Sequence, residues 1–447
     1  MFFKNKFVTI FLFCFFVTNV YSIELIRDVE LEEFTKEIML PLTRSSNLED
    51  NRIDFYFINS NEVNAFVTAG QRIFINTELI IQSETYAEYL GVIAHELSHI
   101  NAGHISRTKN QIAELTEKSM PIYLLGILGI LGGETDAGIA AMMVGSASVQ
   151  DGYLYYSRTQ EAAADQLTIS LLCKANLPSW GLESFIKTLE RETSQSSQDY
   201  KYKSTHPQIS DRYNWLQNSY KKYPNCQNNL DLKLERKFQN IRAKLTAFTH
   251  NQNEVFALYK NEEDEFAKYA VAAANFFSGN QEKSINQIQS LIDMYPTNPY
   301  YHEFLGEIYF FQGDYTNALK KQKTAMNILS KDSDLHLMIL GTYLLAESSN
   351  ESIIESIKVL NKSLFLNKYN SYSWYLLAKA YALNDNLPLA QYASAERYYL
   401  NGDRPLALEF AKKAIKNIDK NTVEWYRTND LIELILGIDE KNNKNRP

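Results

Sequence analysis

The sequence predicts a mainly α-helical chain in two parts, an α+β domain with a small β-sheet and then an α-solenoid of helical repeats. Three observations predict this fold class. Short apolar runs typical of strands occupy residues 53–76, a helical pattern follows from Glu84, and small and aromatic residues recur beyond residue 250. The length of 447 residues also exceeds what one hydrophobic core usually organises.

The β-rich segment consists of three apolar runs, 53–58, 65–67 and 72–75, separated by a polar turn and by Gly70. Runs this short with turn residues between them predict a small hairpin or meander. The apolar residues that follow are spaced by three or four positions, which predicts a helix that ends near Gly103.

The second part of the chain repeats itself. Gly341 follows Gly306 by 35 positions and Ala378 follows Gly341 by 37, with aromatic residues near each of them. This spacing is typical of the tetratricopeptide helix pair. We therefore expect stacked helices of about 12 to 15 residues, whose surface binds peptides or proteins. A helical cap that only stabilises the first domain is the alternative.

Composition excludes one class of partner. The net charge is −8, and no cluster of Lys and Arg provides the phosphate contacts that nucleic-acid binding requires. We therefore expect no nucleic-acid partner. Hydrophobic residues make up 45% and charged residues 22%, which is typical of a folded globular protein.

Residues 1–22 are typical of a secretion signal, because Lys4 and Lys6 precede a short apolar run that ends in small residues. We expect a cleaved signal peptide, and an uncleaved N-terminal anchor is the alternative. Its removal would leave Cys173 and Cys226. The sequence does not determine whether these two form a disulfide, because pairing requires their Cα atoms to be close.

Two apolar stretches, 121–131 and 137–149, follow the predicted helix. Each is shorter than the roughly 20 residues that a membrane-spanning helix needs. Their Gly and Ala content predicts a helical hairpin packed on the first domain. A peripheral contact with a membrane is the alternative.

A metal-binding motif lies inside the predicted helix, at His95-Glu96-Leu97-Ser98-His99. Four positions turn a helix by about 400°, so both imidazoles emerge on one face, one turn apart. Such a pair binds Zn²⁺, and Glu96 lies where its carboxylate reaches the attacking water. We predict one zinc ion per chain, with His95 and His99 as ligands and Glu96 as the catalytic base.

A third ligand is predicted at Glu161, within the segment SRTQEAAAD of residues 157–165. Glu161 and Asp165 are four apart on an expected helix, so Glu161 completes a site of two histidines and one glutamate. Asp165 lies one turn further on, where it accepts a hydrogen bond from the non-ligating nitrogen of a zinc-bound histidine. We predict it as a second catalytic residue beside Glu96.

Two further histidines have candidate roles. His104 lies about 140° around the helix from His99, and the sequence lacks the pattern HExxHxxGxxH, so we interpret it as a residue behind the ligands or a structural one. His206 precedes Pro207 on an expected loop. It is a candidate fourth ligand that closes the site, or a group that stabilises the oxyanion, or a loop histidine without catalytic duty.

These segments together resemble a known family. HELSH at 95–99, EAAAD at 161–165, the THP segment before Arg212 and the run Asn64-Ala65-Phe66 are similar to the HtpX-like gluzincin zinc metallopeptidases. The trailing repeats resemble their BepA-like periplasmic subgroup. The resemblance implies a gluzincin zinc metallopeptidase domain over residues 23–250 and a tetratricopeptide repeat domain over 251–447.

The resemblance also implies roles for particular residues. It implies that Asn64, Ala65 and Phe66 form an edge strand that pairs with extended substrate backbone. It further implies that His206 acts on a loop covering the zinc and that Arg212 lies near the cleft.

The function implied by the resemblance is that of a secreted periplasmic zinc endopeptidase in the assembly and quality control of outer-membrane proteins. Its substrates would be unfolded or misassembled envelope proteins, and its repeats would dock on the outer-membrane assembly machinery. The alternative is a repeat-based chaperone or adaptor whose peptidase site is mostly latched shut.

Overall fold

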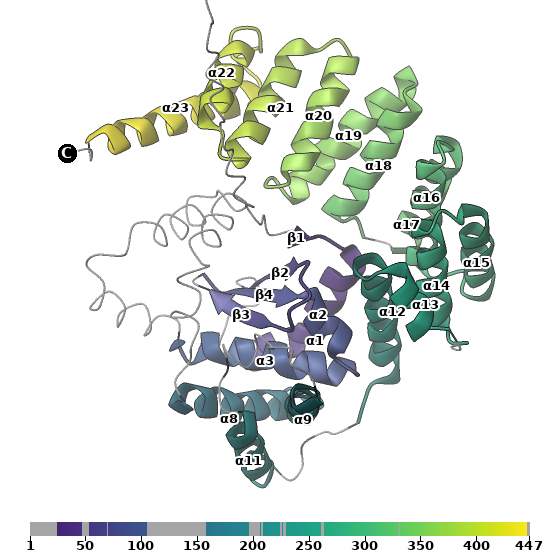
Figure 1. Cartoon of the computed structure of the whole chain (residues 1–447). Coiled ribbons are helices and arrows are strands. Elements are labelled where there is room, and N and C mark those ends of the chain that lie inside the picture. The colour runs from purple at the N-terminus through teal and green to yellow at the C-terminus, as the bar shows by residue number, and fades with distance from the viewer. Residues whose placement is uncertain are drawn as a thin grey trace, which may run out of the picture.

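The computed structural model describes residues 25–46, 53–68, 70–104, 158–195, 206, 209–223, 226, 229–260, 263–329 and 331–444. The predicted signal peptide and the two apolar stretches of 121–149 lie outside these residues. Within the described part, no helix combines the length and the hydrophobicity needed to cross a membrane. Figure 1 shows the two parts that the sequence predicts, a small sheet with packed helices and a curved stack of helices above and beside it.

The sheet has four strands in the order β1-β2-β4-β3, with bounds Leu25–Ile26 (β1), Asp54–Ile58 (β2), Ala65–Thr68 (β3) and Arg72–Asn76 (β4). Strands β3 and β4 form the predicted hairpin, and Gly70 and Gln71 at its turn have positive φ. The meander alternative is wrong, because β2 pairs with β4 in parallel rather than with β3. Apolar patterning locates strands but does not identify their neighbours, which depend on how the connections cross the sheet.

Among the described residues, the helices of the sheet-containing part are Val29–Ser45 (α1), Thr77–Gln82 (α2), Tyr86–Asn101 (α3), Arg158–Lys174 (α8), Gly181–Gln195 (α9), Ile209–Tyr220 (α11) and Leu232–Thr249 (α12). The helix α3 begins where Thr85 caps the amide of Glu88, and the chain leaves it at Gly103, which has a positive φ of 66°. It lies between the sheet and the pair α8 and α9 (Figure 1), so every residue from Tyr86 to His99 is buried. The motif helix is therefore the centre of this part of the molecule.

Two glycines allow α3 and α9 to touch through their backbones. A Cβ atom built on Gly181 would lie 1.7 Å from the carbonyl oxygen of Ala87, and one on Gly91 would lie 2.3 Å from the amide nitrogen of Leu182. Backbone atoms cannot move aside as a flexible side chain can, so any larger residue would push the two helices apart.

We expect Gly181→Ala to lower the free energy of unfolding by about 2 to 3 kcal/mol, because the added methyl overpacks a backbone contact. Gly437→Ala is the matched control, since a Cβ there meets nothing within 4 Å. It should leave stability unchanged or raise it by up to about 1 kcal/mol. Urea unfolding followed by circular dichroism measures both, and equal midpoints would contradict the close approach.

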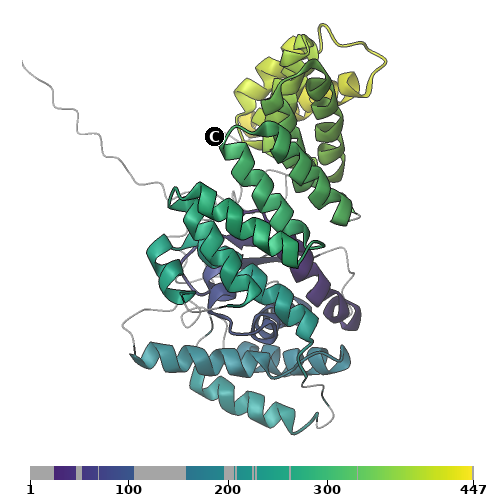
Figure 2. The same cartoon turned by 90° about the vertical axis from the view of Figure 1, so that its right-hand side faces the viewer.

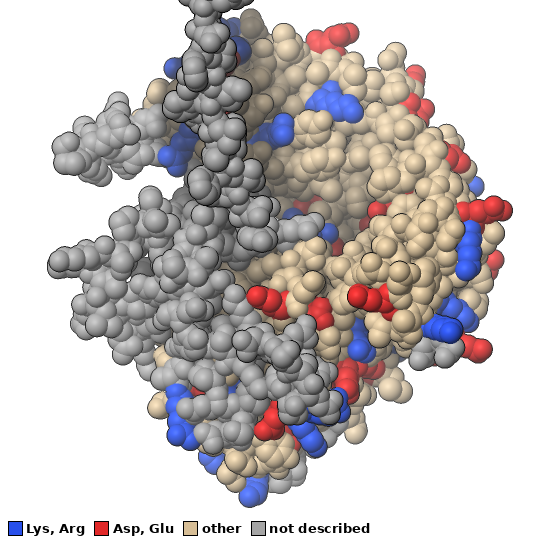
Figure 3. All heavy atoms as spheres, in the orientation of Figure 1, with Lys and Arg blue, Asp and Glu red and all other residues tan. Residues whose placement is uncertain are grey.

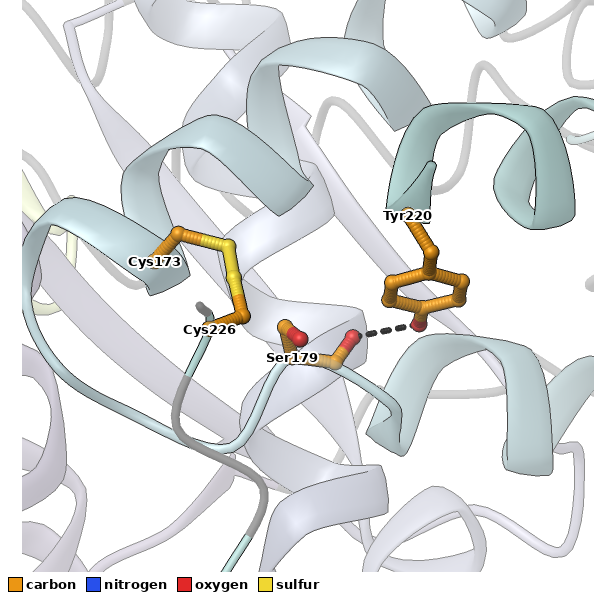
Figure 4. Close-up of a disulfide and its surroundings, with 4 residues drawn as sticks. All are labelled: Cys173, Ser179, Tyr220 and Cys226. Atoms are coloured by element: carbon orange, nitrogen blue, oxygen red, sulfur yellow. Dashed lines mark hydrogen bonds between the residues drawn. A yellow bond between two sulfur atoms is a disulfide. The ribbon is translucent and has the colours of Figure 1, made fainter. Parts of the chain in front are cut away.

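Cys173 and Cys226 form a disulfide, with their Cα atoms 5.0 Å apart, which answers the question that the sequence left open. Figure 4 shows the hydroxyl of Tyr220 pointing to the backbone of Ser179, and this hydrogen bond to the carbonyl oxygen measures 2.6 Å. The two links tie the end of α11 and the segment after it to α8 and to the turn before α9. The helix that carries Arg212 is thereby held against the one that carries Glu161.

The second part consists of antiparallel helix pairs, as the repeats predict: Gln252–Leu258 (α13), Glu265–Phe277 (α14), Gln281–Met294 (α15), Pro299–Phe311 (α16), Tyr315–Leu329 (α17), Asp334–Glu347 (α18), Asn350–Leu366 (α19), Ser371–Leu383 (α20), Leu387–Leu400 (α21), Arg404–Ala414 (α22) and Val423–Lys444 (α23). Small residues lie at the helix crossings: a Cβ on Gly306 would be 3.2 Å from the carbonyl oxygen of Ala318. The view turned by 90° shows the helices stacking along one curved array (Figure 2). The predicted fold class is confirmed.

One helix belongs to both parts. Phe238, Ile241 and Leu245 of α12 pack in the core beneath the sheet, whereas Ala243 and Ala247 of the same helix pack in the first core of the solenoid. The domain boundary at residue 250 stays a prediction, and α12 couples the domains on its two sides. In the space-filling view the molecule is hollowed between them (Figure 3).

Candidate active site

The motif helix and two later segments bring four metal-binding side chains together. His95 and His99 come from α3, Glu161 comes from the first turn of α8, and His206 comes from the segment before α11. All four are buried, and one ligand atom from each lies within 4.8 Å of the others. Four ligand atoms this close together can bind a single metal ion.

The separations between these atoms fit a tetrahedral zinc ion. Zinc bonds of about 2.0 to 2.1 Å place neighbouring ligand atoms about 3.3 Å apart. The Nε2 atoms of His95 and His99 are 3.0 Å apart, and Nε2 of His95 is 3.4 Å from Oε2 of Glu161. Nδ1 of His206 is 3.1 Å from Oε1 of Glu161 and 3.4 Å from Nε2 of His95. Three nitrogens and one carboxylate oxygen are also a typical donor set for zinc.

The outer nitrogens of the two motif histidines are also engaged. Nδ1 of His95 lies 3.0 Å from Oδ1 of Asp165, and Nδ1 of His99 lies 2.9 Å from Nδ1 of His104. Each contact orients an imidazole so that its Nε2 faces the ligand cluster. Asp165 thus lies behind His95, as the sequence spacing suggests, and its catalytic role stays a prediction.

Arg212 from α11 binds the carboxylates behind the ligands. Its Nε and Nη2 donate hydrogen bonds of 3.0 and 2.8 Å to the two oxygens of Asp165, and its Nη1 lies 3.3 Å from Oε2 of Glu161. Burial alone would raise the pKa of Asp165, but the charge of Arg212 and the hydrogen bond with His95 outweigh it and lower that pKa. The charges of His206 and then Arg212 likewise outweigh burial and hold the pKa of Glu161 well below its usual value.

Glu96 lies beside the cluster without ligating it. Its side chain is fully buried, and neither carboxylate oxygen has a hydrogen-bond partner among the described residues. Nε2 of His206 is its charged neighbour, 3.2 Å from Oε1. A buried carboxylate that lacks hydrogen bonds costs stability and is typical of a catalytic group.

The charges around His206 favour a cation in the cluster. Burial lowers the pKa of its imidazole, but the carboxylates of Glu161 and Glu96 raise that pKa to about 9. A zinc ion bound there would supply the positive charge that these acids attract.

The predicted substrate strand lies at the edge of the described sheet. Ala65 and Phe66 belong to β3, which pairs only with β4 in that sheet, and Asn64 directly precedes it. The ring of Phe66 stacks on that of Phe74, with centroids 5.1 Å apart. Strand β3 also contacts α3, the helix that carries two of the predicted zinc ligands.

Sequence reasoning missed a hydroxyl pair that joins the two metal-binding helices. Oγ of Ser98 lies 3.0 Å from Oγ1 of Thr168, and both side chains are completely buried. The pair fixes the spacing between α3 and α8 close to the ligands. A sequence signal existed, because Thr168 follows Glu161 by seven positions and so lies on the same face of its helix.

Two histidine ligands, one glutamate ligand and an adjoining buried glutamate in a helix define a zinc metallopeptidase. Residues 27–219 match peptidase family M48, and this part of the chain is an M48 peptidase domain. The chain is therefore a metalloprotease, its cofactor is zinc, and the resemblance inferred from the motifs is confirmed.

Relatives extend the similarity into the repeats. The beta-barrel assembly-enhancing protease of Escherichia coli (strain K12) is 23% identical over 372 residues, which cover 82% of this chain and 74% of that protein. The protein of the same description from Yersinia pestis is 22% identical over 369 residues, covering 81% and 74%. The matched regions are longer than the peptidase domain, so they include helices of the solenoid.

Proposed function

We propose that this protein is a secreted, periplasmic zinc endopeptidase that acts in the assembly and quality control of outer-membrane proteins. The main support for the proposal is the buried cluster of three nitrogens and one carboxylate. It lies beside Glu96, whose carboxylate has no hydrogen bond among the described residues. The names of the relatives support the cellular role, and the predicted signal peptide of residues 1–22 supports the location. Unfolded or misassembled envelope proteins are the proposed substrates.

The residues divide the work of peptide hydrolysis. When bound, zinc acts as a Lewis acid that polarises the scissile carbonyl and lowers the pKa of water. Glu96 accepts the proton of the attacking water and delivers it to the leaving amine. Asp165 and His104 hold the two motif histidines, and Arg212 holds Asp165 in place.

The edge strand β3 is proposed to position the substrate. An extended peptide that adds to β3 receives main-chain hydrogen bonds that do not depend on its side chains. This mode suits an enzyme whose substrates share an unfolded state rather than a sequence. The contact of β3 with α3 supports it, because a strand added there runs beside the zinc ligands.

His206 is proposed as a latch that closes the site. Catalytic zinc sites keep one coordination position open for water or substrate, and Nδ1 of His206 lies among the other three ligand atoms at that position. Its Nε2 at the same time contacts Glu96, the proposed base. While His206 is in place, substrate has no access to the metal.

We expect His206→Ala to raise cleavage of an unfolded protein, by about tenfold if the latch is open in about a tenth of molecules. A lower rate would instead assign His206 to transition-state stabilisation, and an unchanged rate would contradict both roles. His302→Ala, a histidine of α16 that bonds a backbone carbonyl, is the control and should leave the rate unchanged. Initial rates of casein cleavage at equal zinc content measure the difference.

The latch also favours a second candidate function, that of a chaperone or adaptor whose repeats dock on the outer-membrane assembly machinery. Expression of Glu96→Gln in cells that lack the protein separates the two. Loss of outer-membrane protein assembly with this variant supports the protease, and normal assembly supports the adaptor. A contact of residues 121–149 with a membrane stays a prediction, and no nucleic-acid partner is proposed.

A further inference from the structure

A cavity of about 410 Å³ lies where the solenoid meets the peptidase domain, and its lining shares no residue with the zinc cluster. The N-terminal segment and α12 form one wall, and α16 and α18 form the other. In Figure 1 this is the junction where β1 and α12 approach the solenoid. Its volume is within the range of about 300 to 1,000 Å³ that is typical of ligand sites.

Aromatic rings line much of this junction cavity. The rings of Phe248 and Phe304 have centroids 5.7 Å apart, and those of Tyr269 and Phe304 are 5.4 Å apart. The ring of Tyr300 already has a cation against its face, with Nζ of Lys244 5.2 Å from its centroid. Such walls accept the alkyl stem of a side chain and attract a positive charge.

The cations in the wall already have acidic partners. Nζ of Lys244 lies 2.8 Å from Oδ2 of Asp28 and 2.6 Å from Oε2 of Glu30. Nη2 of Arg27 lies 3.3 Å from Oδ1 of Asp334. These pairs join the N-terminal segment to α12 and to the solenoid, so the charge of each cation is already paired with at least one acid.

Two acids of α16 remain, Glu303 and Glu307, which are four positions apart and therefore lie on one face of the helix. Glu303 contacts Nε2 of His336 at 3.4 Å, whereas Glu307 has no hydrogen bond or ion pair with another described residue. Burial, and then the charge of Glu303, raise the pKa of Glu307 to about 7 against the opposing charge of Lys244. An unpaired acid in such a place lowers stability, so its presence calls for a ligand.

We propose that the junction cavity binds the cationic side chain of a lysine or arginine from a polypeptide partner. Glu303 and Glu307 hold the ammonium or guanidinium group, and the ring of Phe304 packs against its stem. Two carboxylates on one helix face match the planar donor pattern of arginine. The proposal does not depend on peptidase activity.

The test is binding of a short, labelled Gly-Ser-Leu peptide that carries one central arginine, compared with the same peptide carrying neutral citrulline. Fluorescence anisotropy is measured at pH 8 with the full chain carrying Glu96→Gln, so that the peptide stays uncut. We expect the arginine peptide to bind at least about tenfold more tightly, as charged hydrogen bonds contribute. Equal affinities for the two peptides would overturn the proposal, and this comparison requires no variant of the cavity residues.

Variants of the cavity acids test where the arginine peptide binds. Glu303→Gln with Glu307→Gln should abolish the preference for arginine, whereas Glu351→Gln, an exposed acid of α19, should retain it. Because Glu307 is unpaired, Glu307→Gln alone should weaken binding without lowering the urea midpoint. A preference that survives the double variant would place the binding elsewhere and overturn the proposal. A lowered midpoint of Glu307→Gln with unchanged binding would assign this acid to the fold and overturn it as well.

Discussion

Glu96→Gln is expected to reduce the rate of peptide cleavage by about 10²- to 10⁴-fold, the usual contribution of a general base. The amide has nearly the same shape as the carboxylate but cannot accept the proton of the attacking water. Among the described residues, Glu96 has a charged contact with Nε2 of His206, 3.2 Å from Oε1, and the amide oxygen of glutamine can occupy the same place. The measurement is the initial rate on an unfolded model protein at saturating zinc.

Zinc content and stability provide the controls for this variant. Because Glu96 is not among the ligands, the variant should bind one zinc ion per chain, as the unaltered protein does. The free energy of unfolding should change by no more than about 1.5 kcal/mol, because the amide oxygen keeps a hydrogen-bond acceptor beside Nε2 of His206. A variant that cleaves at the normal rate would show that Glu96 is not the base.

Arg212→Met is expected to lower the free energy of unfolding of the metal-free protein by about 3 to 5 kcal/mol, since it leaves buried carboxylates without their cation. Arg212 is completely buried, and it contacts both Asp165 and Glu161. We expect zinc to restore part of the lost free energy of unfolding, because the ion compensates the charge of Glu161 but does not contact Asp165. Urea unfolding in chelator and in excess zinc measures both quantities.

Arg236→Met is the matched control, because it removes the charge of an arginine that lies at the surface. Arg236 also pairs with a glutamate, Glu265, but 55% of its side chain is exposed. Exposed pairs contribute about 0 to 1 kcal/mol, so this change should have little effect. If the two arginine variants lost the same stability, the buried network around Asp165 would not be the cause.

The metal ligands could be predicted because their relation is local. His95 and His99 are one turn apart, as are Glu161 and Asp165, so helical periodicity alone places each pair on one face. The repeats were visible for the same reason, since Gly306 and Gly341 occupy equivalent places in successive helix pairs. In each case the informative residues lie within a few turns or at a fixed period.

Other contacts depend on tertiary structure and had no sequence signal. Arg212 reaches Asp165 across 47 positions, and Lys244 reaches Glu30 across 214. The parallel pairing of β2 with β4 is likewise decided by how the chain crosses the sheet. The orientation of His206, with Nδ1 toward the cluster and Nε2 toward Glu96, follows from packing that spacing does not encode.

The central claim is that this buried cluster binds one zinc ion that cleaves peptide bonds. Its most direct test is the cleavage of an unfolded model protein by the purified chain, with metal content measured on the same samples. We predict one zinc per chain, cleavage that disappears when a chelator removes the zinc, and recovery when zinc is restored. Cleavage that continues in zinc-free protein would contradict the account.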